Sequence, residues 1–279
     1  MRAKRIVKGI LTVSGMLLAA LLFAVGKDQR IRGDRFLKNV TIQAEGEGFE
    51  ISRDPSGQDD SFSAWTQCRK EPLKSGSGRT CDADVIAVNG DSGCVYPAGT
   101  NLPASDPGGC IIGKKLAEDL FGSDHAMGEK LVWREREWTV RAVVEEPSEL
   151  CMLQASGIKD QLVFDRISIA VPEEDDRRKA VEEFVVSQGL DAHALRWDYL
   201  YGAEWFLEMV PSDWSDFDGW GENLKQRNKA VKYAKTAEKS AIEESGLSYR
   251  RRGVIFYAAG FFCVMAGLVI IRWKAACKM

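Results

Sequence analysis

The sequence predicts an α+β domain, with a mixed or antiparallel sheet, carried between two membrane-spanning helices. Two uncharged apolar segments bracket the chain, Gly9–Gly26 and Gly253–Ile271. Each is long enough to cross a hydrocarbon core of about 30 Å as a helix. Between them, short β-branched or apolar runs alternate with two short helical patterns, which is typical of the α+β class.

The charges at both ends of the chain predict which way the two spans run. Lipid offers no hydrogen-bond partner to the backbone, so each isolated apolar segment must be helical. Basic residues precede the first span and follow the second, which favours cytoplasmic termini, residues 1–8 and 272–279. We discount the basic residues on the inner flanks, because a long loop is translocated largely regardless of its charge. The first span is interpreted as an uncleaved signal anchor. The terminal basic residues are Arg2, Lys4, Arg5, Lys8, Arg272, Lys274 and Lys278.

The net charge limits which classes of partner the central domain can bind. The whole chain carries −3 although both termini are basic, so the region between the spans is acidic. An acidic domain argues against nucleic acid or anionic lipid headgroups as its partner.

The first part of the domain predicts two strands and a loop. Phe36–Gln43 is β-branched and alternates, which indicates a strand. Glu45–Ser61 is polar with turn residues and indicates a loop. Asp84–Val88 is an apolar strand that ends at the turn signal Asn89-Gly90.

The middle of the domain has the most regular pattern. Cys110–Ile112 is a short apolar strand, and Lys114–Phe121 is a short helix that Gly122 ends. Two alternating strands and a tight turn between them follow: Glu129–Trp133, Arg134–Glu135 and Arg136–Val144.

The last part of the domain predicts a strand and two helices. Ile167–Val171 is a strand, and Pro172 to Gln188 forms a helix with acidic residues at its positive end. From Asn223 to Ser245 the chain is rich in strong helix formers, and Gly246 interrupts it. Four alanines place small residues along one face of this last helix. The helix is either solvated and alanine-rich by coincidence, or it forms a stalk that packs closely on another helix. The four alanines are Ala230, Ala234, Ala237 and Ala241.

Seven cysteines are present, five of them between the spans. Cys68 and Cys81 flank the tip of a predicted hairpin, and Cys94 and Cys110 flank a loop rich in Pro and Gly. Outside the cytoplasm, disulfides could close both loops, with free thiols as the alternative. Cys151 is left over in the domain.

Neither histidine indicates a catalytic or metal site. His125 and His193 each lie in a predicted turn or surface loop, and the spacing of cysteine and histidine does not suit structural zinc. We therefore expect no enzyme activity, no cofactor and no metal.

Residues 197–220 combine aromatic and acidic side chains. Such a cluster forms either a surface for a cationic or carbohydrate ligand, or core packing near the membrane. The tryptophans of this candidate ligand surface are Trp197, Trp205, Trp214 and Trp220.

One segment resembles a known family. Gly109–Gly122, Ala126–Leu131 and Trp138–Glu145 follow the order strand, helix closing in Leu-Phe-Gly, Gly-Glu-Lys, and a strand with Thr-Val and Val-Val. This order resembles the extracytoplasmic core domain of MacB-type ABC transporter permeases, the FtsX-like family. Arg141-Ala142 stands where that family usually has Val-Gly. Permeases of the family have further spans after the second one, so we expect this chain to be a short, two-span form.

The resemblance implies a domain plan and partners. It implies a two-lobed extracytoplasmic domain at 27–221, a helical stalk at 222–252, and spans at 9–26 and 253–271 in the cell membrane. In the family a separate subunit or domain hydrolyses ATP. We therefore expect a non-enzymatic subunit that transmits motion or engages a partner or client, together with permease-like chains, a second copy or a separate ABC ATPase. The alternative is a stand-alone anchored sensor or ligand-binding protein.

One face of the second span carries small residues, which would let a partner helix pack closely against it. These small residues, Ala259, Cys263 and Gly267, are four residues apart.

Overall fold

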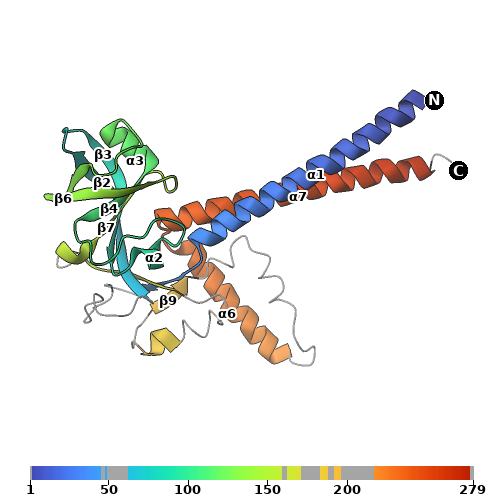
Figure 1. Ribbon diagram of the computed structural model, residues 1–279. Coiled ribbons are helices and arrows are strands. Elements are labelled where there is room, and N and C mark those ends of the chain that lie inside the picture. Colours follow the sequence, from blue (N-terminus) through green and yellow to red (C-terminus); the bar gives the residue numbers. More distant parts are fainter. Residues whose placement is uncertain are drawn as a thin grey trace. The chain divides into compact units, whose positions relative to one another are not determined.

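The computed structural model describes residues 2–44, 48, 62–158, 162–170, 183–187, 192–195 and 217–276. The chain divides into two units (Figure 1). Met1–Asp34 and Gly246–Met279 form a helical hairpin, and Arg35–Ser245 form the sheet domain. The helices are α1 (Arg2–Phe36), α2 (Ser92–Val95), α3 (Lys114–Phe121), α6 (Phe217–Thr236) and α7 (Ala241–Ala276). The strands are β1 (Val40–Ala44), β2 (Phe62–Ser75), β3 (Thr80–Asn89), β4 (Gly109–Gly113), β5 (Lys130–Trp133), β6 (Arg136–Val144), β7 (Leu150–Gln154), β8 (Arg166–Ile169) and β9 (Ala192–Leu195).

The sheet is mixed and closes partly on itself, which confirms the α+β class. Its order is β3-β7-β4-β6-β5-β2-β8-β1-β9, with a further pairing of β3 to β2. Six strands therefore form a ring, and β8, β1 and β9 extend it from the first half of β2. The pairs β3–β7 and β4–β6 are parallel, and the others are antiparallel.

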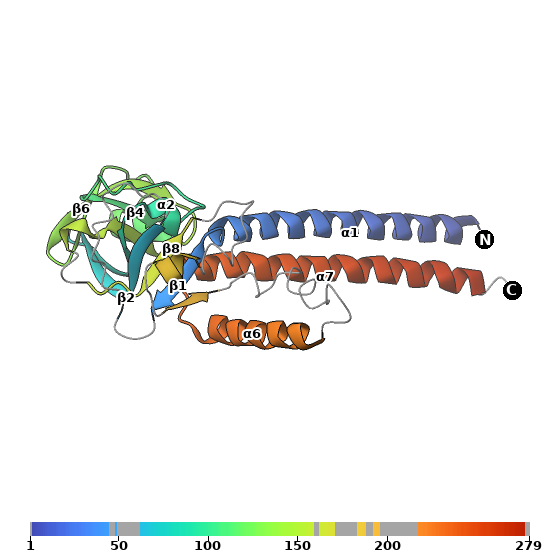
Figure 2. The same cartoon turned by 90° about the horizontal axis from the view of Figure 1, so that it is seen from below.

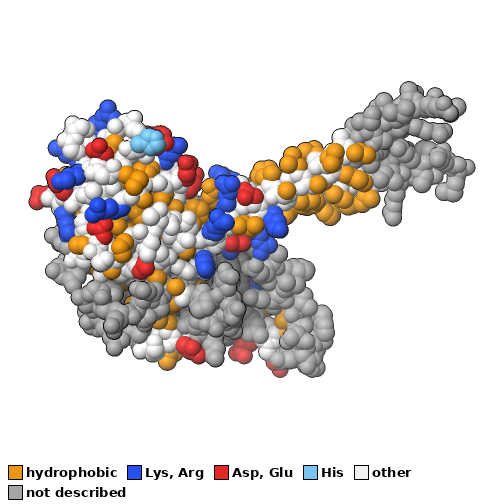
Figure 3. Space-filling view, viewed as in Figure 1, with side chains coloured by type: hydrophobic (Ala, Val, Ile, Leu, Met, Phe, Trp, Pro, Cys, Tyr) orange, Lys and Arg blue, Asp and Glu red, His pale blue; other side chains and the backbone are white. Residues whose placement is uncertain are grey.

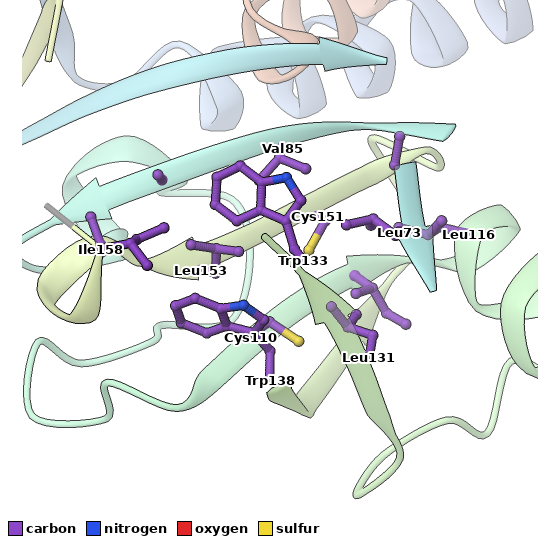
Figure 4. Close-up of a cluster of buried hydrophobic side chains, with 14 of the residues drawn as sticks. Leu73, Val85, Cys110, Leu116, Leu131, Trp133, Trp138, Cys151, Leu153 and Ile158 are labelled. Atoms are coloured by element: carbon purple, nitrogen blue, oxygen red, sulfur yellow. The ribbon is translucent and has the colours of Figure 1, made fainter. Parts of the chain in front are cut away.

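The strand faces bury two apolar clusters. Side chains on one face fill the ring with Trp133, Trp138 and Leu73 among them (Figure 4). The opposite faces of β3, β4 and β7 contribute to a second cluster that includes Trp65. Because successive strand residues point to opposite sides, the continuous apolar runs of β4 and β7 indicate burial on both faces.

The most regular part of the sequence folds as predicted. Helix α3 has the predicted bounds and ends at Gly122, whose φ of 79° is left-handed. Arg134 and Glu135 both have positive φ, 47° and 63°, as a two-residue turn between β5 and β6 requires.

Several predicted elements differ. α1 continues to Phe36, where a strand was expected to begin, because pairs such as Arg32–Asp28 at 2.9 Å support another two turns of helix. β2, β7 and β9 were not predicted, and His193 lies on β9 instead of in a loop. Residues 183–187 are helical, within the helix predicted to start at Pro172, whose first part lies outside the described residues.

The helix predicted over Asn223–Ser245 is divided in two. α6 ends at Thr236 and α7 begins at Ala241, so the four alanines do not share one helix. Gly246 does not interrupt the helix either, because it lies inside α7.

The two long helices of the hairpin run side by side in both views (Figures 1 and 2). Among the described residues, one segment, Ala241–Val269, is long and apolar enough to cross a membrane.

Candidate functional site

The start of α7 is fixed by a reciprocal cap. The hydroxyl of Ser240 accepts a hydrogen bond from the backbone N–H of Glu243 at 3.2 Å. The carboxylate of Glu243 accepts one from the backbone N–H of Ser240 at 2.8 Å. This Ser-x-x-Glu capping box satisfies two backbone donors of the first turn of α7.

A buried arginine holds this cap on the sheet. Arg166 of β8 is 3% exposed and donates from Nη1 to Oε2 of Glu243 at 3.0 Å, where Glu243 is 5% exposed. Its Nη2 also donates to the carbonyl of Glu238. The guanidinium lies 5.0 Å from the ring centre of Trp65. Removing one member of such a buried pair leaves an uncompensated charge, which costs about 3–5 kcal/mol.

A second arginine holds the connection between α6 and α7 from β2. Arg69 donates to Oε1 of Glu238 at 2.5 Å and to the carbonyl of Lys239, and lies 3.5 Å from a carboxylate oxygen of Glu244. Partial burial lowers the pKa of Arg69, but the hydrogen bond to Glu238 and the charge of Glu244 outweigh it, so the pKa is raised.

These contacts explain why one predicted helix became two. The carbonyls of Glu238 and Lys239 accept hydrogen bonds from arginine side chains. Ser240 then caps a new helix. Tertiary contacts have therefore overridden a strong local preference for helix.

The first turn of α7 also contributes to the core. Ile242 is 2% exposed and belongs to the apolar cluster that contains Trp65. The backbone N–H of Ala241 donates to Oε1 of Gln67 at 3.1 Å. We name residues 238–244, together with Arg69 and Arg166, the α7 junction.

The end of α1 is held on the sheet domain at a second place, the α1 junction (residues 36–39). Asn39 donates from Nδ2 to the carbonyl of Cys94 at 2.7 Å. The ring of Phe36 lies 5.8 Å from that of Tyr96. Leu37 between them is 6% exposed.

One strand links the two junctions. β8 pairs with β1, which follows the α1 junction, and with β2, which carries Arg69. Arg166 of β8 holds the α7 junction. Ser168 of the same strand accepts a hydrogen bond from the indole of Trp65 at 2.8 Å. β8 therefore contacts the segments that hold the end of α1 and the start of α7.

Within the helical hairpin, α1 and α7 approach closely at glycines. A Cβ atom on Gly26 would lie 3.2 Å from the carbonyl oxygen of Gly253, and one on Gly253 would lie 3.1 Å from that of Gly26. A Cβ atom on Gly33 would lie 2.8 Å from the carbonyl oxygen of Gly246. The positions repeat every seven residues in each helix, as for a packed helix pair.

An ion pair closes the hairpin beside these glycines. Arg250 is 6% exposed, and its Nη2 lies 2.7 Å from Oδ1 of Asp34. Arg30 lies 3.7 Å from the other oxygen of the same carboxylate. The close glycine contacts and this ion pair therefore both hold α1 against α7.

The small residues proposed for partner packing are not all placed together. Ala234 is buried, Ala237 lies in the connection after α6, and Ala241 opens α7. Ala230 lies in α6. Ala259 and Cys263 are half-buried, and a Cβ atom on Gly267 would meet nothing within 4 Å. The intrachain seam uses other small residues, which the heptad spacing of Gly246, Gly253 and Gly260 could have revealed.

Of the aromatic ligand surface, only Trp220 can be placed. It is half-buried in α6. Trp197, Trp205 and Trp214 lie outside the described residues. This surface stays a prediction.

The predicted disulfides are not formed. The six described cysteines are all free thiols, including Cys94 on α2. In the β2–β3 hairpin Cys81 faces Leu73, five positions along β2 from Cys68. Five strand residues span roughly 16 Å, far beyond the Cα separation of a disulfide. The tip of this hairpin lies between the two cysteines as predicted, but the cysteines are out of register.

Cys110 and Cys151 lie next to each other inside the ring (Figure 4). A hydrogen bond between the two thiols and their burial raise the pKa of Cys110 well above its usual value. Both side chains are fully buried, so we expect both to resist N-ethylmaleimide in the folded protein and to react once it is unfolded. For Cys110 the raised pKa also lowers the fraction of reactive thiolate. Mass spectrometry of labelled peptides measures this. Labelling of Cys110 in the folded protein as fast as that of Cys68 would contradict the expectation.

Among the described residues, no group of three His, Cys, Asp or Glu side chains could hold a metal ion. His125 lies in the loop after α3 with its side chain 94% exposed.

No family model and no curated protein matches the chain. Solved structures resemble it. The periplasmic region of MacB from Actinobacillus actinomycetemcomitans shares 15% identity at a TM-score of 0.49, over 65% of this chain and 97% of that one. The extracellular domain of the ABC-type transporter YknZ from Gram-positive bacteria shares 15% identity at a TM-score of 0.41, over 57% of this chain and 100% of that one. At this identity and with TM-scores below 0.5, these matches describe a likeness of fold and carry no conclusion about function.

Proposed function

We propose that this chain is a non-enzymatic membrane subunit of the MacB/FtsX type, whose sheet domain transmits motion or engages a partner in an ATPase-driven complex. The spans would be 9–26 and 253–271, with the termini in the cytoplasm and 27–252 outside it. The observation that carries the proposal is β8, which pairs with the strand after α1 and holds the start of α7 through Arg166.

The geometry suits the transfer of displacement. α7 is one uninterrupted helix from its cap at Ser240 to Ala276, so movement of its first turn is passed along its axis. The Gly26–Gly253 contact and the Asp34–Arg250 pair make α1 move with it. A partner that shifts the sheet domain would thereby shift the hairpin, and the reverse holds as well.

The experiment is purification of the tagged full-length chain from its native membranes in mild detergent, followed by mass spectrometry. We expect an ABC ATPase subunit or a second permease-like chain to be recovered. ATPase activity of the recovered complex is then compared between the wild type and Glu243→Gln, with Glu118→Gln, an exposed carboxylate on α3 outside the α7 junction, as the control. The first variant should change the activity and the second should not. Recovery of neither an ATPase nor a permease would contradict the proposal and favour the stand-alone sensor.

A further inference from the structure

A belt of apolar side chains surrounds the described part of the hairpin. Leu17 is 67% exposed, Leu21 60%, Ile255 56% and Phe262 72%. Figure 3 shows apolar side chains along this part of the hairpin. Large apolar side chains exposed all along two helices indicate a surface that lies in lipid. This belt gives way to charged residues at one level on both helices.

The contact between Gly26 and Gly253 sets that level. Lys27 follows Gly26 directly, and Arg252 precedes Gly253 directly. The charged residues that border the apolar belt, Lys27 on α1 and Arg252 on α7, therefore stand at the same level of the hairpin. We name residues 27–34 and 250–252 the collar.

The collar is strongly basic. It contains six basic and two acidic residues, a net charge of +4, in a chain whose total is −3. Both acidic residues are engaged inside the collar, Asp28 with Arg32 at 2.9 Å and Asp34 with Arg250 at 2.7 Å. Lys27, Arg251 and Arg252 are exposed. In Figure 3, Lys and Arg side chains gather where the apolar surface ends.

We propose that the collar binds the phosphate headgroups of anionic phospholipids in the leaflet that faces the sheet domain. This inference rests on the membrane insertion of the hairpin that the proposed function includes. The positive-inside tendency does not explain these residues, because they lie on the domain side of both predicted spans. Basic side chains beside an apolar helix do match the negative surface of a leaflet that contains anionic lipid. Arg252 also lies over the ring of Tyr249 at 5.5 Å, and tyrosine is common at membrane interfaces.

The test uses the full chain in nanodiscs of phosphatidylcholine with phosphatidylglycerol in equal parts, and native mass spectrometry of the lipid that stays bound. We expect phosphatidylglycerol to be enriched over phosphatidylcholine. The double variant Arg251→Gln with Arg252→Gln should lower that enrichment by about tenfold. The matched control, Lys70→Gln with Lys74→Gln, removes the same charge from exposed positions on β2 and should leave it unchanged.

The two failures are distinguishable. Insertion without enrichment, or an equal loss of enrichment in both double variants, overturns the collar proposal and leaves the proposed function standing. A chain that does not enter nanodiscs of either lipid overturns the membrane hairpin itself, and with it both proposals.

Discussion

The variant Glu243→Gln is expected to lower the free energy of unfolding of the full-length protein by about 3 kcal/mol. Glutamine keeps the hydrogen bond of the capping box, because Gln serves at this position as Glu does. What it removes is the buried negative charge opposite Arg166, which is 3% exposed and then keeps only the 3.7 Å contact of its Nε with the half-exposed carboxylate of Asp165. Chemical unfolding in detergent, followed by tryptophan fluorescence, measures the change.

Two controls separate the ion pair from its surroundings. Ser240→Ala removes the cap alone and should cost about 1 kcal/mol. Glu244→Gln changes an exposed carboxylate 3.5 Å from Arg69 and should cost at most about 1 kcal/mol. Adding Arg166→Met to Glu243→Gln should restore part of the lost stability, since the buried charge that has lost its closest partner is then gone. A Glu243→Gln loss no larger than that of Glu244→Gln would show that the α7 junction is not held by this pair.

The second large effect is expected from Gly33→Leu. A Cβ atom at this position would lie 2.8 Å from the carbonyl oxygen of Gly246 and 2.9 Å from Cγ of Arg250. The helices must separate to admit the side chain, which costs about 1–3 kcal/mol in overpacking and also pulls Arg250 from Asp34. Thermal unfolding of the full chain in detergent should show a clear fall in Tm.

Gly15→Leu is the matched control for Gly33→Leu. A Cβ atom on Gly15 would meet nothing within 4 Å, and leucine is the better helix former. We expect its Tm to equal or exceed that of the wild type. Equal losses for both variants would mean that the glycine seam does not hold α1 to α7.

Local signals predicted the central part of the fold well. The run from Lys114 to Phe121 has a helical apolar face and a glycine to end it, so α3 needs no tertiary information. The two strands around Arg134 are likewise set by alternation and a turn. β2 was missed because it carries Pro72 and many polar residues, and only its pairing with β3, β5 and β8 makes it a strand.

The candidate site was largely beyond the reach of local patterns. Arg166 begins a short strand, and nothing nearby in the sequence indicates that its partner is Glu243, 77 positions later. The capping box at Ser240 was a visible signal, but the alanine seam suggested a continuous helix across it. The small residues of the second span illustrate the same limit, because a single helix does not reveal which of its faces the neighbouring helix covers.

The most direct test of the central claim is photo-crosslinking in native membranes from an unnatural amino acid at Ala237. This position lies between α6 and α7, beside the α7 junction, and its side chain is half-buried. We expect an adduct with a permease-like chain, in a complex that also contains an ABC ATPase. Only adducts between copies of this chain, or no adduct, would contradict membership of an ATPase-driven complex.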